Sequence, residues 1–441
     1  MSKWKKSIYT FVIEKGEEII LYNSFMGAIA RIPKEHTNRV RNILNNGIDE
    51  IQLDELLVAE LCVQGFLIDS EINEQYLVRS TLEKEQDSTL GLTIMPHEDC
   101  NFRCSYCYES FENGLITPKI MRGIKLFVKK KAERENFLRM TCSWFGGEPL
   151  LAFDEILDMS DAFIESCNEN DIKYLSSMTT NGYLLTPERV EKLIERNVLY
   201  FQITLDGPEE IHNRSRKLVG GQGTYSTIMK NLIALKDINN KDLTVKIRVN
   251  FSPTTIETIE NWIRDEIAPE FSADKRFMIT FQPIRNWGRC NKNINEYFHD
   301  QIFIGDYISY LNNACINLGF SKQDVRQSLD PHGNVCYASK SNSIVIGSDG
   351  SIYKCTVAFD NSINSIGVIN VDGTLNLNKV KMGMWTKDYV DSTEKCGKCA
   401  FYPSCQTKKC PLISINCGNP TCPDIFENIE SYITATISAE I

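Results

Sequence analysis

Three cysteines near residue 100 have the residue type and spacing of a metal site. They are Cys100, Cys104 and Cys107, in the pattern C-x3-C-x2-C. Cysteine thiolates are the usual ligands of iron–sulfur clusters, and a [4Fe–4S] cube ordinarily takes four of them. Three thiolates therefore leave one iron open, and a catalytic metal site keeps such a position for its substrate. The alternative is a zinc knuckle that takes a fourth ligand such as His97.

The chain around this loop alternates apolar, strand-like stretches with amphipathic helical ones. The expected strands are Gly91–Met95, Met140–Phe145, Leu175–Thr179, Leu199–Leu205, Thr244–Asn250 and Phe277–Gln282. Six strand–helix units in series predict an α/β fold whose parallel sheet forms a partial barrel, because eight strands are needed to close one. Such barrels keep their active sites at the carboxyl ends of their strands. The cysteine loop follows the first strand, which favours a catalytic cluster over a zinc knuckle.

A second group of cysteines lies toward the end of the chain. Eight of the sixteen cysteines fall between residues 336 and 422. They are Cys336, Cys355, Cys396, Cys399, Cys405, Cys410, Cys417 and Cys422. Clustered cysteines in a chain without a secretion signal indicate metal rather than disulfides. Because C-x2-C is also a zinc spacing, two zinc sites of four thiolates each are the alternative to iron–sulfur clusters.

Charge and hydropathy argue against nucleic acid and membrane as partners. The net charge is −10 and the pI is about 5.3, which disfavours nonspecific binding to nucleic acid. No run approaches 18 uncharged apolar residues, so we expect no membrane-spanning helix. The N-terminus has lysines but lacks the apolar core of a signal peptide, and we expect a cytoplasmic protein.

The first 80 residues have the pattern of a separate small unit. Ile8–Ile13 and Ile19–Tyr22 are strand-like and a turn separates them. Helical stretches and a short closing strand follow, an order that suits a winged-helix-like module. Residues 69–90 are polar and charged without a clear core pattern, so we expect a linker or a solvated helix there.

The loop sequence CNFRCSYC resembles the signature of the radical S-adenosylmethionine (SAM) superfamily. Motifs after the next three expected strands resemble that family's GGE, TNG and further SAM-binding segments. The positions that the resemblance assigns to SAM binding are Tyr106, Gly146, Gly147, Glu148, Pro149, Thr180, Asn181, Thr204, Asp206 and Arg216. It also places Arg248 and Asn250, on the fifth strand, where the family often lines its active site. The alternatives are ordinary turns for the glycine-containing motifs and a structural ion pair for Arg248.

The same resemblance implies the chemistry. SAM occupies the open iron, the reduced cluster passes one electron to the sulfonium, and a 5′-deoxyadenosyl radical abstracts hydrogen from a substrate. The cofactor carries this chemistry, while the protein supplies orientation and a dry site. Glu148 is expected to pair with the amino group of SAM through a charge-assisted hydrogen bond.

The second cysteine group resembles the SPASM domain, which holds two auxiliary [4Fe–4S] clusters and brings the expected total to three. One departure is that four residues separate Cys405 from Cys410 where the family has three. The resemblance assigns to auxiliary cluster I the residues Cys336, Cys355 and Cys410. It assigns to auxiliary cluster II Cys396, Cys399 and Cys405, with Cys422 favoured over Cys417 as the fourth ligand. Cluster I has no motif-matched fourth ligand, so an open iron is expected there.

Radical SAM enzymes with SPASM domains mostly modify peptides and proteins. One class oxidises Ser or Cys of sulfatases to formylglycine, and another installs thioether or carbon–carbon crosslinks in ribosomally made peptides. The second class is favoured here, because the N-terminal module resembles the PqqD-like fold that binds leader peptides as an added edge strand. A purely structural module is the alternative. Sulfatase maturases also place an Asp base directly after the second SPASM cysteine, where this chain has Thr356.

The expected organisation has four parts: a leader-binding module at 1–80, the radical SAM partial barrel at 88–290, a helical bridge at 291–335 and the SPASM domain at 336–441. The expected function is crosslinking of a precursor peptide, with a thioether favoured and formylglycine formation as the alternative. The resemblance also implies a low-potential electron donor such as flavodoxin or ferredoxin. The identity of the peptide and the bond formed stay open.

Overall fold

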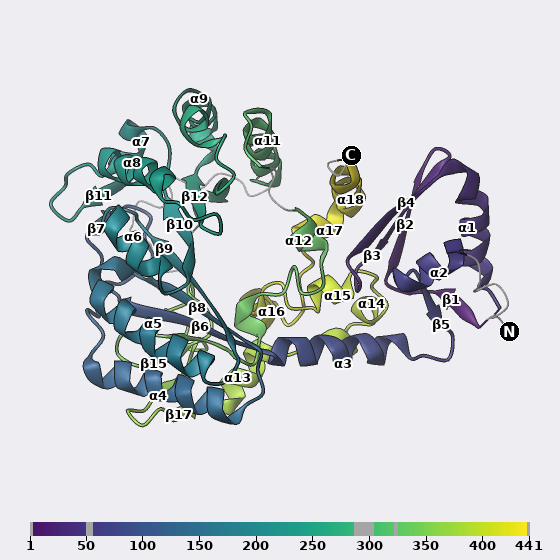
Figure 1. The fold of residues 1–441 in the computed structure, drawn as a ribbon, viewed down its shortest axis with the longest axis horizontal. Coiled ribbons are helices and arrows are strands. Elements are labelled where there is room, and N and C mark those ends of the chain that lie inside the picture. Colours follow the sequence, from purple (N-terminus) through teal and green to yellow (C-terminus); the bar gives the residue numbers. More distant parts are fainter. Residues whose placement is uncertain (1–2, 50–55, 286–303, 322–324, 439–441) are drawn as a thin grey trace. The chain divides into compact units, whose positions relative to one another are not determined.

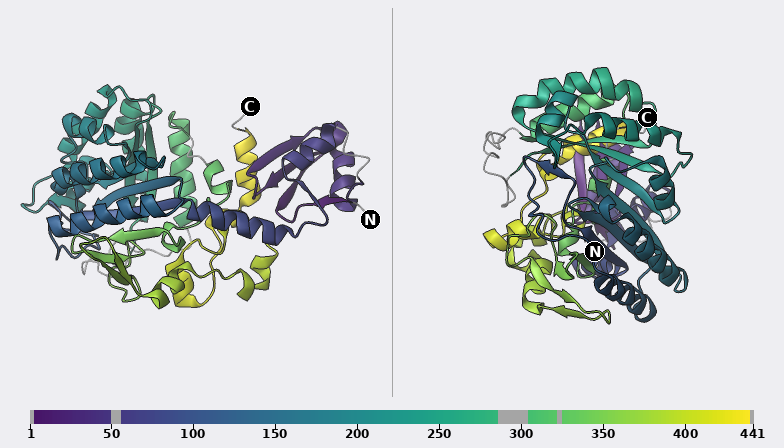
Figure 2. Two further views of the ribbon diagram at one scale, coloured as in Figure 1. Left: turned by 60° about the horizontal axis from the view of Figure 1, so that its bottom comes forward. Right: turned by 90° about the vertical axis from the view of Figure 1, so that its left-hand side faces the viewer.

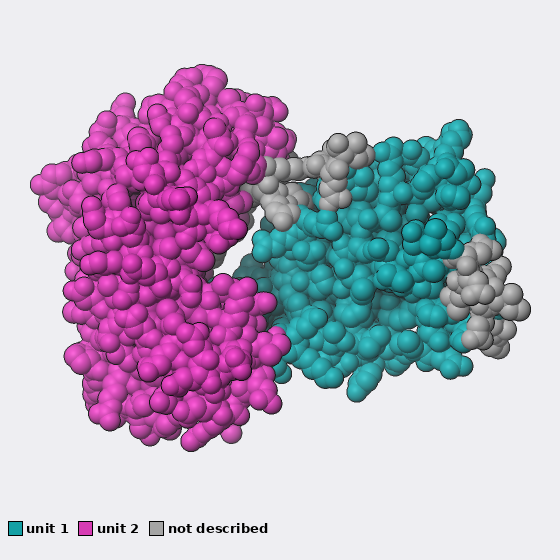
Figure 3. All heavy atoms as spheres, in the orientation of Figure 1, with its two compact units in different colours: residues 1–87, 324–341, 383–441 teal, residues 88–323, 342–382 magenta. Residues whose placement is uncertain are grey.

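The computed structural model describes residues 3–49, 56–285, 304–321 and 325–438. These residues form two compact units, which are coloured separately in Figure 3. Unit 1 contains residues 1–87, 324–341 and 383–441, and unit 2 contains residues 88–323 and 342–382. The units therefore cross the boundaries expected from the sequence. Of the bridge expected at 291–335, residues 291–303 and 322–324 lie outside the described residues.

Unit 2 is built on a ten-stranded sheet in the order β13-β12-β10-β9-β8-β6-β14-β15-β16-β17. The first six strands of this order are parallel and form the expected partial barrel, visible in Figure 1 and Figure 2. Their bounds are β6 Thr89–His97, β8 Arg139–Gly146, β9 Lys173–Thr180, β10 Val198–Thr204, β12 Thr244–Phe251 and β13 Phe277–Pro283. The main helices of the unit are α4 Pro118–Arg134, α5 Phe153–Asn168, α6 Pro187–Ile194, α7 Glu209–Ser215, α8 Tyr225–Ala234, α9 Ile256–Trp262, α10 Ala268–Phe271 and α11 Ile304–Asn317.

Successive side chains along each strand point alternately to the hydrophobic core and to the barrel interior. In β12, Val245, Ile247 and Val249 are buried, whereas Arg248 and Asn250 point to the other face. The helices begin at recognisable caps. The Thr117 side chain accepts a hydrogen bond from the backbone of α4, and proline stands at the first position of that helix. Local sequence thus agrees with the tertiary fold in this unit.

The C-terminal half of the chain extends this sheet. β14 (Ser343–Ile346) pairs in parallel with β6, and β15 (Ser351–Tyr353) pairs antiparallel with β14, so that β14 and β15 form a hairpin. β16 (Ser365–Ile369) and β17 (Leu375–Leu377) complete the sheet. These strands gain their pairing partners from tertiary contact rather than from local pattern.

Unit 1 begins with a three-stranded antiparallel sheet. Its strands are β2 Thr10–Lys15, β3 Glu18–Asn23 and β4 Ala28–Ile32, and a separate pair joins β1 Trp4–Lys6 to β5 Leu67–Asp69. One face of the sheet packs on helices α1 Lys34–Asn46 and α2 Leu56–Val63. This order of strands and helices agrees with a winged-helix-like module.

The other face of the same sheet packs on the C-terminal part of unit 1. Ile20 and Tyr22 of β3 belong to one hydrophobic cluster with Phe401, Ile429 and Ile433, while their neighbours in the strand pack with the helices. Burial on both faces explains why the four central residues of β3, from Ile19 to Tyr22, are all apolar or aromatic. The helices of this part are α12 Val325–Leu329, α14 Glu394–Gly397, α15 Tyr402–Cys405, α16 Pro411–Cys417, α17 Asp424–Glu427 and α18 Ile429–Ser438. Helix α13 (Lys379–Thr386) begins in unit 2 and ends in unit 1.

Residues 74–87 form helix α3 (Glu74–Asp87), which is not a solvated linker. Val78 and Leu82 are buried against Tyr9, Val390 and Tyr402. Their partners come from distant parts of the chain, so the local pattern did not show a core face. Across the described ranges, no helix is long and apolar enough to cross a membrane.

Candidate active site and iron–sulfur sites

A cavity of about 160 Å³ opens at the carboxyl ends of the parallel strands of unit 2. All three cysteines of the first group line it. The other sequence-predicted residues on its wall are Tyr106, Gly146, Gly147, Thr180, Asn181, Thr204, Arg216, Arg248 and Asn250. The structure thus brings together residues from five strand ends and the cysteine loop, as expected of a barrel enzyme.

The cysteine loop is held by strand pairing. β7 (Phe102–Cys104) pairs antiparallel with β11 (Arg216–Leu218), and Cys104 stands directly opposite Arg216. The Cys100 sulfur accepts a hydrogen bond from the backbone N–H of Phe102 at 3.3 Å. The Asn181 amide also approaches this sulfur, at 3.7 Å. Donors placed around a sulfur stabilise its thiolate form, which is the form that binds iron.

The charge state of these thiols fits a metal cluster. Burial raises the pKa of Cys100 and Cys104, and it raises the pKa of Cys107 to about 12. Three neighbouring thiols of this kind stay protonated at neutral pH unless a cation compensates their charge. Iron supplies that positive charge. The donor set therefore fits an iron–sulfur cluster held by three thiolates.

Gly146 and Gly147 leave no room for a side chain beside the cysteine loop. A Cβ atom on Gly147 would lie 2.4 Å from the Asp99 carbonyl oxygen, and one on Gly146 would lie 2.5 Å from the His97 carbonyl oxygen. Gly146 also has a φ of 120°. Glycine is thus required at both positions, because the end of β8 lies too close to the cysteine loop for any side chain.

A chain of hydrogen bonds crosses the cavity wall at the Tyr106 hydroxyl. Arg216 Nη1 donates to this oxygen at 2.8 Å and Asn250 Nδ2 donates to it at 3.1 Å. The hydroxyl in turn donates to Asp206. Asn250 Oδ1 accepts a hydrogen bond from Arg248 Nε at 3.0 Å, so five predicted residues form one network.

Electrostatics keep Arg216 charged inside this network. Burial opposes its ionisation, but Cys104, Tyr106 and Asp206 hold its pKa well above the usual arginine value. Burial raises the pKa of Asp206, while Arg216 and the Tyr106 hydroxyl act in the opposite direction. Arg216 Nε is buried and has no hydrogen-bond partner among the described residues. The N–H group at this Nε is therefore available to donate a hydrogen bond to a polar ligand in the cavity.

Glu148 has a position that the sequence did not indicate. Its side chain is fully buried and does not line the cavity. Oε1 accepts hydrogen bonds from Leu150 N at 3.0 Å and Thr180 Oγ1 at 2.6 Å, and Oε2 accepts one from Asn181 N at 2.7 Å. The carboxylate thus joins the end of β8 to the end of β9. Asp206 and Pro149 are also absent from the cavity wall.

Other residues on the wall were missed from the sequence. They are Phe102, Tyr108, Glu109, Phe145, Thr179, Gln202, Pro283, Ile284 and Arg285. Gln202 carries a signal that was available, because it stands two positions before Thr204 on β10 and therefore shares its face. The wall residues after β13 have no comparable motif.

Comparison with known proteins agrees with this geometry. The family model described as the radical SAM superfamily matches residues 94–265, which include the end of β6, the cysteine loop and the next four parallel strands. The chain contains a radical SAM domain, and it is an enzyme. SAM and iron–sulfur clusters are its cofactors.

Relatives of this radical SAM enzyme include maturation enzymes. The chain is 26% identical to the cysteine-type anaerobic sulfatase-maturating enzyme of Clostridium novyi (strain NT), and the match covers 79% of this chain and 96% of that enzyme. It is also 26% identical, over 53% of its length and 55% of that protein's, to the radical SAM cyclopropyl synthase TigE of Paramaledivibacter caminithermalis.

Two solved structures share its fold. Native anSMEcpe with bound AdoMet matches with a TM-score of 0.52 and 20% identity, covering 72% of this chain and 88% of that chain. Streptococcus suis SuiB matches with a TM-score of 0.50 and 16% identity, covering 94% of this chain and 97% of that one. The SuiB structure thus matches a larger share of this chain than the anSMEcpe structure does.

A second cavity of the enzyme lies within unit 1 and gathers cysteines of the second group. Four thiols line it: Cys396, Cys399, Cys405 and Cys422. The remaining wall is mostly apolar, with Phe401, Tyr402, Pro423 and Phe426. Cys417 is exposed and does not line this cavity.

The three cysteines expected at auxiliary cluster I are divided between the two units. Cys336 and Cys410 belong to unit 1, where Cys336 N donates to the Lys408 carbonyl oxygen at 2.9 Å. Cys355 belongs to unit 2 and is buried. Its backbone is held by the fully buried Asn364, whose Oδ1 accepts from Cys355 N and whose Nδ2 donates to the Cys355 carbonyl, both at 2.8 Å. No sequence motif indicated Asn364.

Proposed function

We propose that this enzyme is a peptide maturase that installs an intramolecular crosslink, with a thioether favoured, in a ribosomally made precursor peptide. One observation carries the proposal. A winged-helix-like module with its own three-stranded sheet precedes the radical SAM barrel in the same chain. The fold of SuiB covers this module, since it matches 94% of the chain, whereas that of anSMEcpe covers 72%.

The module offers a way to bind a leader peptide. Its sheet has the order β2-β3-β4, so β2 and β4 are edge strands within the described residues. An extended peptide adds to such an edge through main-chain hydrogen bonds, while its side chains occupy alternating pockets. Binding of a leader here would raise the local concentration of the attached core peptide.

The barrel cavity supplies the reaction site. When bound there, SAM and a [4Fe–4S] cluster held by Cys100, Cys104 and Cys107 provide a 5′-deoxyadenosyl radical. Tyr106, anchored by Arg216 and Asp206, would border the adenosyl group. The Asn181 amide would stay beside the Cys100 sulfur. Arg248 and Asn250 would face the substrate, because they lie on the cavity wall at the end of β12.

We further propose the ligands of two auxiliary clusters. Cys396, Cys399, Cys405 and Cys422 share one cavity wall, which supports their assignment to cluster II and favours Cys422 over Cys417. Cluster I would take Cys336, Cys355 and Cys410 and keep one iron open for the thiolate of a substrate cysteine. A crosslink removes two hydrogens from the peptide. The deoxyadenosyl radical would take one as an atom, and the other would leave as a proton, with an auxiliary cluster as the acceptor of the remaining electron.

Formylglycine formation in a sulfatase is the second candidate, and the relatives named as sulfatase-maturating enzymes favour it. The residue after Cys355 argues against it, because Thr356 offers no carboxylate base at that position. The proposal includes a cytoplasmic location, where a flavodoxin or ferredoxin supplies low-potential electrons.

Anaerobic co-expression with candidate precursor peptides, followed by mass spectrometry, tests the function. A crosslink lowers the peptide mass by about 2 Da per event, and conversion of cysteine to formylglycine lowers it by about 18 Da. Because conversion of serine to formylglycine also removes about 2 Da, a hydrazide reagent must show that no aldehyde formed. Aldehyde in a sulfatase peptide, without modification of any precursor, would overturn the proposal.

A further inference from the structure

Helix α3 carries a single buried stripe along its whole length. The stripe consists of Glu74, Val78, Leu82 and Gln86, which recur at every fourth position. Such spacing places side chains above one another on one helix face. The two ends of the stripe are polar, and buried polar groups require partners. The residues that bond to and pack against this stripe show which parts of the chain α3 stabilises.

At its beginning, α3 is bonded to the N-terminal module. The Glu74 carboxylate accepts hydrogen bonds from the Ser7 hydroxyl and, at 3.0 Å, from Ile8 N. Both donors lie in the turn between β1 and β2. Replacement of this buried carboxylate would leave two donors without a partner. The first turn of α3 and the module are therefore one continuous structure.

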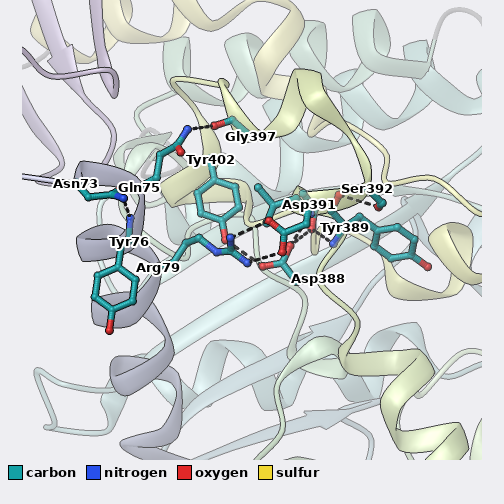
Figure 4. Close-up of polar contacts among 12 residues, drawn as sticks. Asn73, Gln75, Tyr76, Arg79, Asp388, Tyr389, Asp391, Ser392, Gly397 and Tyr402 are labelled. Carbon is teal, nitrogen blue, oxygen red and sulfur yellow. Dashed lines mark hydrogen bonds and ion pairs between the residues drawn. The ribbon is translucent and has the colours of Figure 1, made fainter.

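The first half of α3 contacts the segment that carries Cys396 and Cys399. Gln75 Nε2 donates to the carbonyl oxygen of Gly397, which lies between these cysteines, at 2.6 Å (Figure 4). Arg79 forms a two-point ion pair with Asp391, with N···O distances of 2.9 and 3.1 Å (Figure 4). Bidentate arginine pairs fix geometry better than single contacts do.

Apolar contacts reinforce this junction. Cys399 packs in the same cluster as Val78, Leu82, Tyr9 and Tyr402. Tyr402 begins the helix that ends at Cys405, and its hydroxyl donates to Asp388 at 3.0 Å. The stripe of α3 therefore supports both cysteine-bearing segments of this cavity.

At its end, α3 holds the segment that follows Cys405. Gln86 Nε2 donates to Gln406, and Gln406 Nε2 contacts His332 Nδ1 at 2.7 Å. His332 Nε2 lies 2.9 Å from the carboxylate of Glu85, also in α3. Gln406 and Thr407 are both buried and have φ values of 49° and 57°. A left-handed backbone at two successive non-glycine residues is strained and persists only where surrounding contacts impose it.

We propose that α3 positions auxiliary cluster II by holding Cys396, Cys399 and Cys405 in place through Gln75, Arg79 and Gln86. The inference rests on the ligand assignment made under the proposed function. It explains how the chain accommodates the additional residue between Cys405 and Cys410, because the irregular segment is bonded to a helix. It also makes the leader-binding module and the cluster site parts of one packed unit.

Iron release from the full-length, anaerobically reconstituted enzyme tests the inference. Gln86→Ala leaves the buried Gln406 amide with one partner fewer, so a chelator should remove about one third of the iron about tenfold faster than from the wild type. Gln75→Ala is a second variant, since its exposed position spares the helix core. The EPR signal of cluster II should broaden or shift in both variants, whereas SAM cleavage in the barrel should be unchanged.

Lys84→Ala, at an exposed position of the same helix, is the matched control and should release iron at the wild-type rate. Wild-type release and spectra in both glutamine variants would overturn the inference. Cys399→Ala separates this failure from failure of the ligand assignment. If Cys399→Ala retains all the iron of the wild type, the assignment is wrong; if it loses about four irons per chain, only the role of α3 is in question.

Discussion

The Tyr106 hydroxyl lies 2.8 Å from Nη1 of Arg216, and the same oxygen bonds to Asp206 and Asn250. One hydroxyl thereby joins the cysteine loop to the ends of β10 and β12. Its single donor and two acceptor sites are all used by these three partners. The aromatic residue beside Cys107 is therefore fixed by the barrel rather than by its own loop.

Tyr106→Phe should weaken SAM binding about tenfold, because it leaves buried polar partners without their shared hydroxyl. Isothermal titration of the reconstituted enzyme with SAM measures the change. Tyr76→Phe, at an exposed tyrosine of α3, is the control and should bind SAM like the wild type. An unchanged affinity in Tyr106→Phe would show that the network does not support the cofactor site.

Gly147→Ala should displace the cysteine loop, since the new methyl group would lie 2.4 Å from the Asp99 carbonyl oxygen. Overpacking of this kind costs about 1–3 kcal/mol. We expect the variant to lose the barrel cluster, seen as about four irons fewer per chain, while the unit 1 cavity keeps its iron. Gly383→Ala is the control, because a Cβ there meets no atom within 4 Å. Full iron content in Gly147→Ala would contradict the tight approach.

His212 makes the stability of unit 2 depend on pH. Its Nδ1 accepts from Asp206 N at 3.2 Å, Nε2 lies 3.0 Å from Thr224 Oγ1, and burial lowers its pKa to about 2. The unfolded chain binds a proton near pH 6.5, where the folded chain does not. Stability is therefore complete above that pH and falls as the pH drops toward 2.

Urea unfolding of the wild type should lose about 1 kcal/mol between pH 6.5 and 5.5 from this group. His212→Gln should remove that part of the pH dependence, even though it lowers stability at neutral pH. If the wild type and the variant have parallel pH profiles, His212 is not held neutral in the fold.

The fourth ligand of the unit 1 cavity can be identified by removing single thiols. Cys422→Ala should release or convert the cluster there and lower the iron content by up to about four per chain. Cys417→Ala should keep all the iron, because this thiol does not line the cavity, whereas the Cys422 thiol does. Iron analysis with Mössbauer spectra compares the two variants, and the reverse result would exchange their roles.

Much of the barrel was predictable from the sequence, for a physical reason. Its parallel strands are buried and flanked by capped helices, so local pattern and tertiary environment agree, as at Thr117 and Pro118. The spacing of Cys100, Cys104 and Cys107 and their family resemblance likewise predicted that the three residues lie together, and they line one cavity wall. The role of Glu148 was not predictable, because its three donors come from the ends of two different strands.

Contacts distant in sequence explain the other failures. Residues 74–87 have a buried face only because Tyr9, Val390 and Tyr402 cover it. β14 joins the barrel sheet through pairing with β6, more than two hundred residues earlier, and no local signal encodes that pairing. Asn364 holds the backbone of Cys355 from a position without a motif.

The most direct test of the central claim is 5′-deoxyadenosine formation by the anaerobically reconstituted enzyme after reduction with dithionite in the presence of SAM. The wild type should form 5′-deoxyadenosine and methionine, and Cys104→Ala should form neither. Iron-loaded wild-type enzyme that yields no 5′-deoxyadenosine, or a Cys104→Ala variant that yields as much as the wild type, would contradict the assignment of the three-cysteine cavity as the site of SAM cleavage.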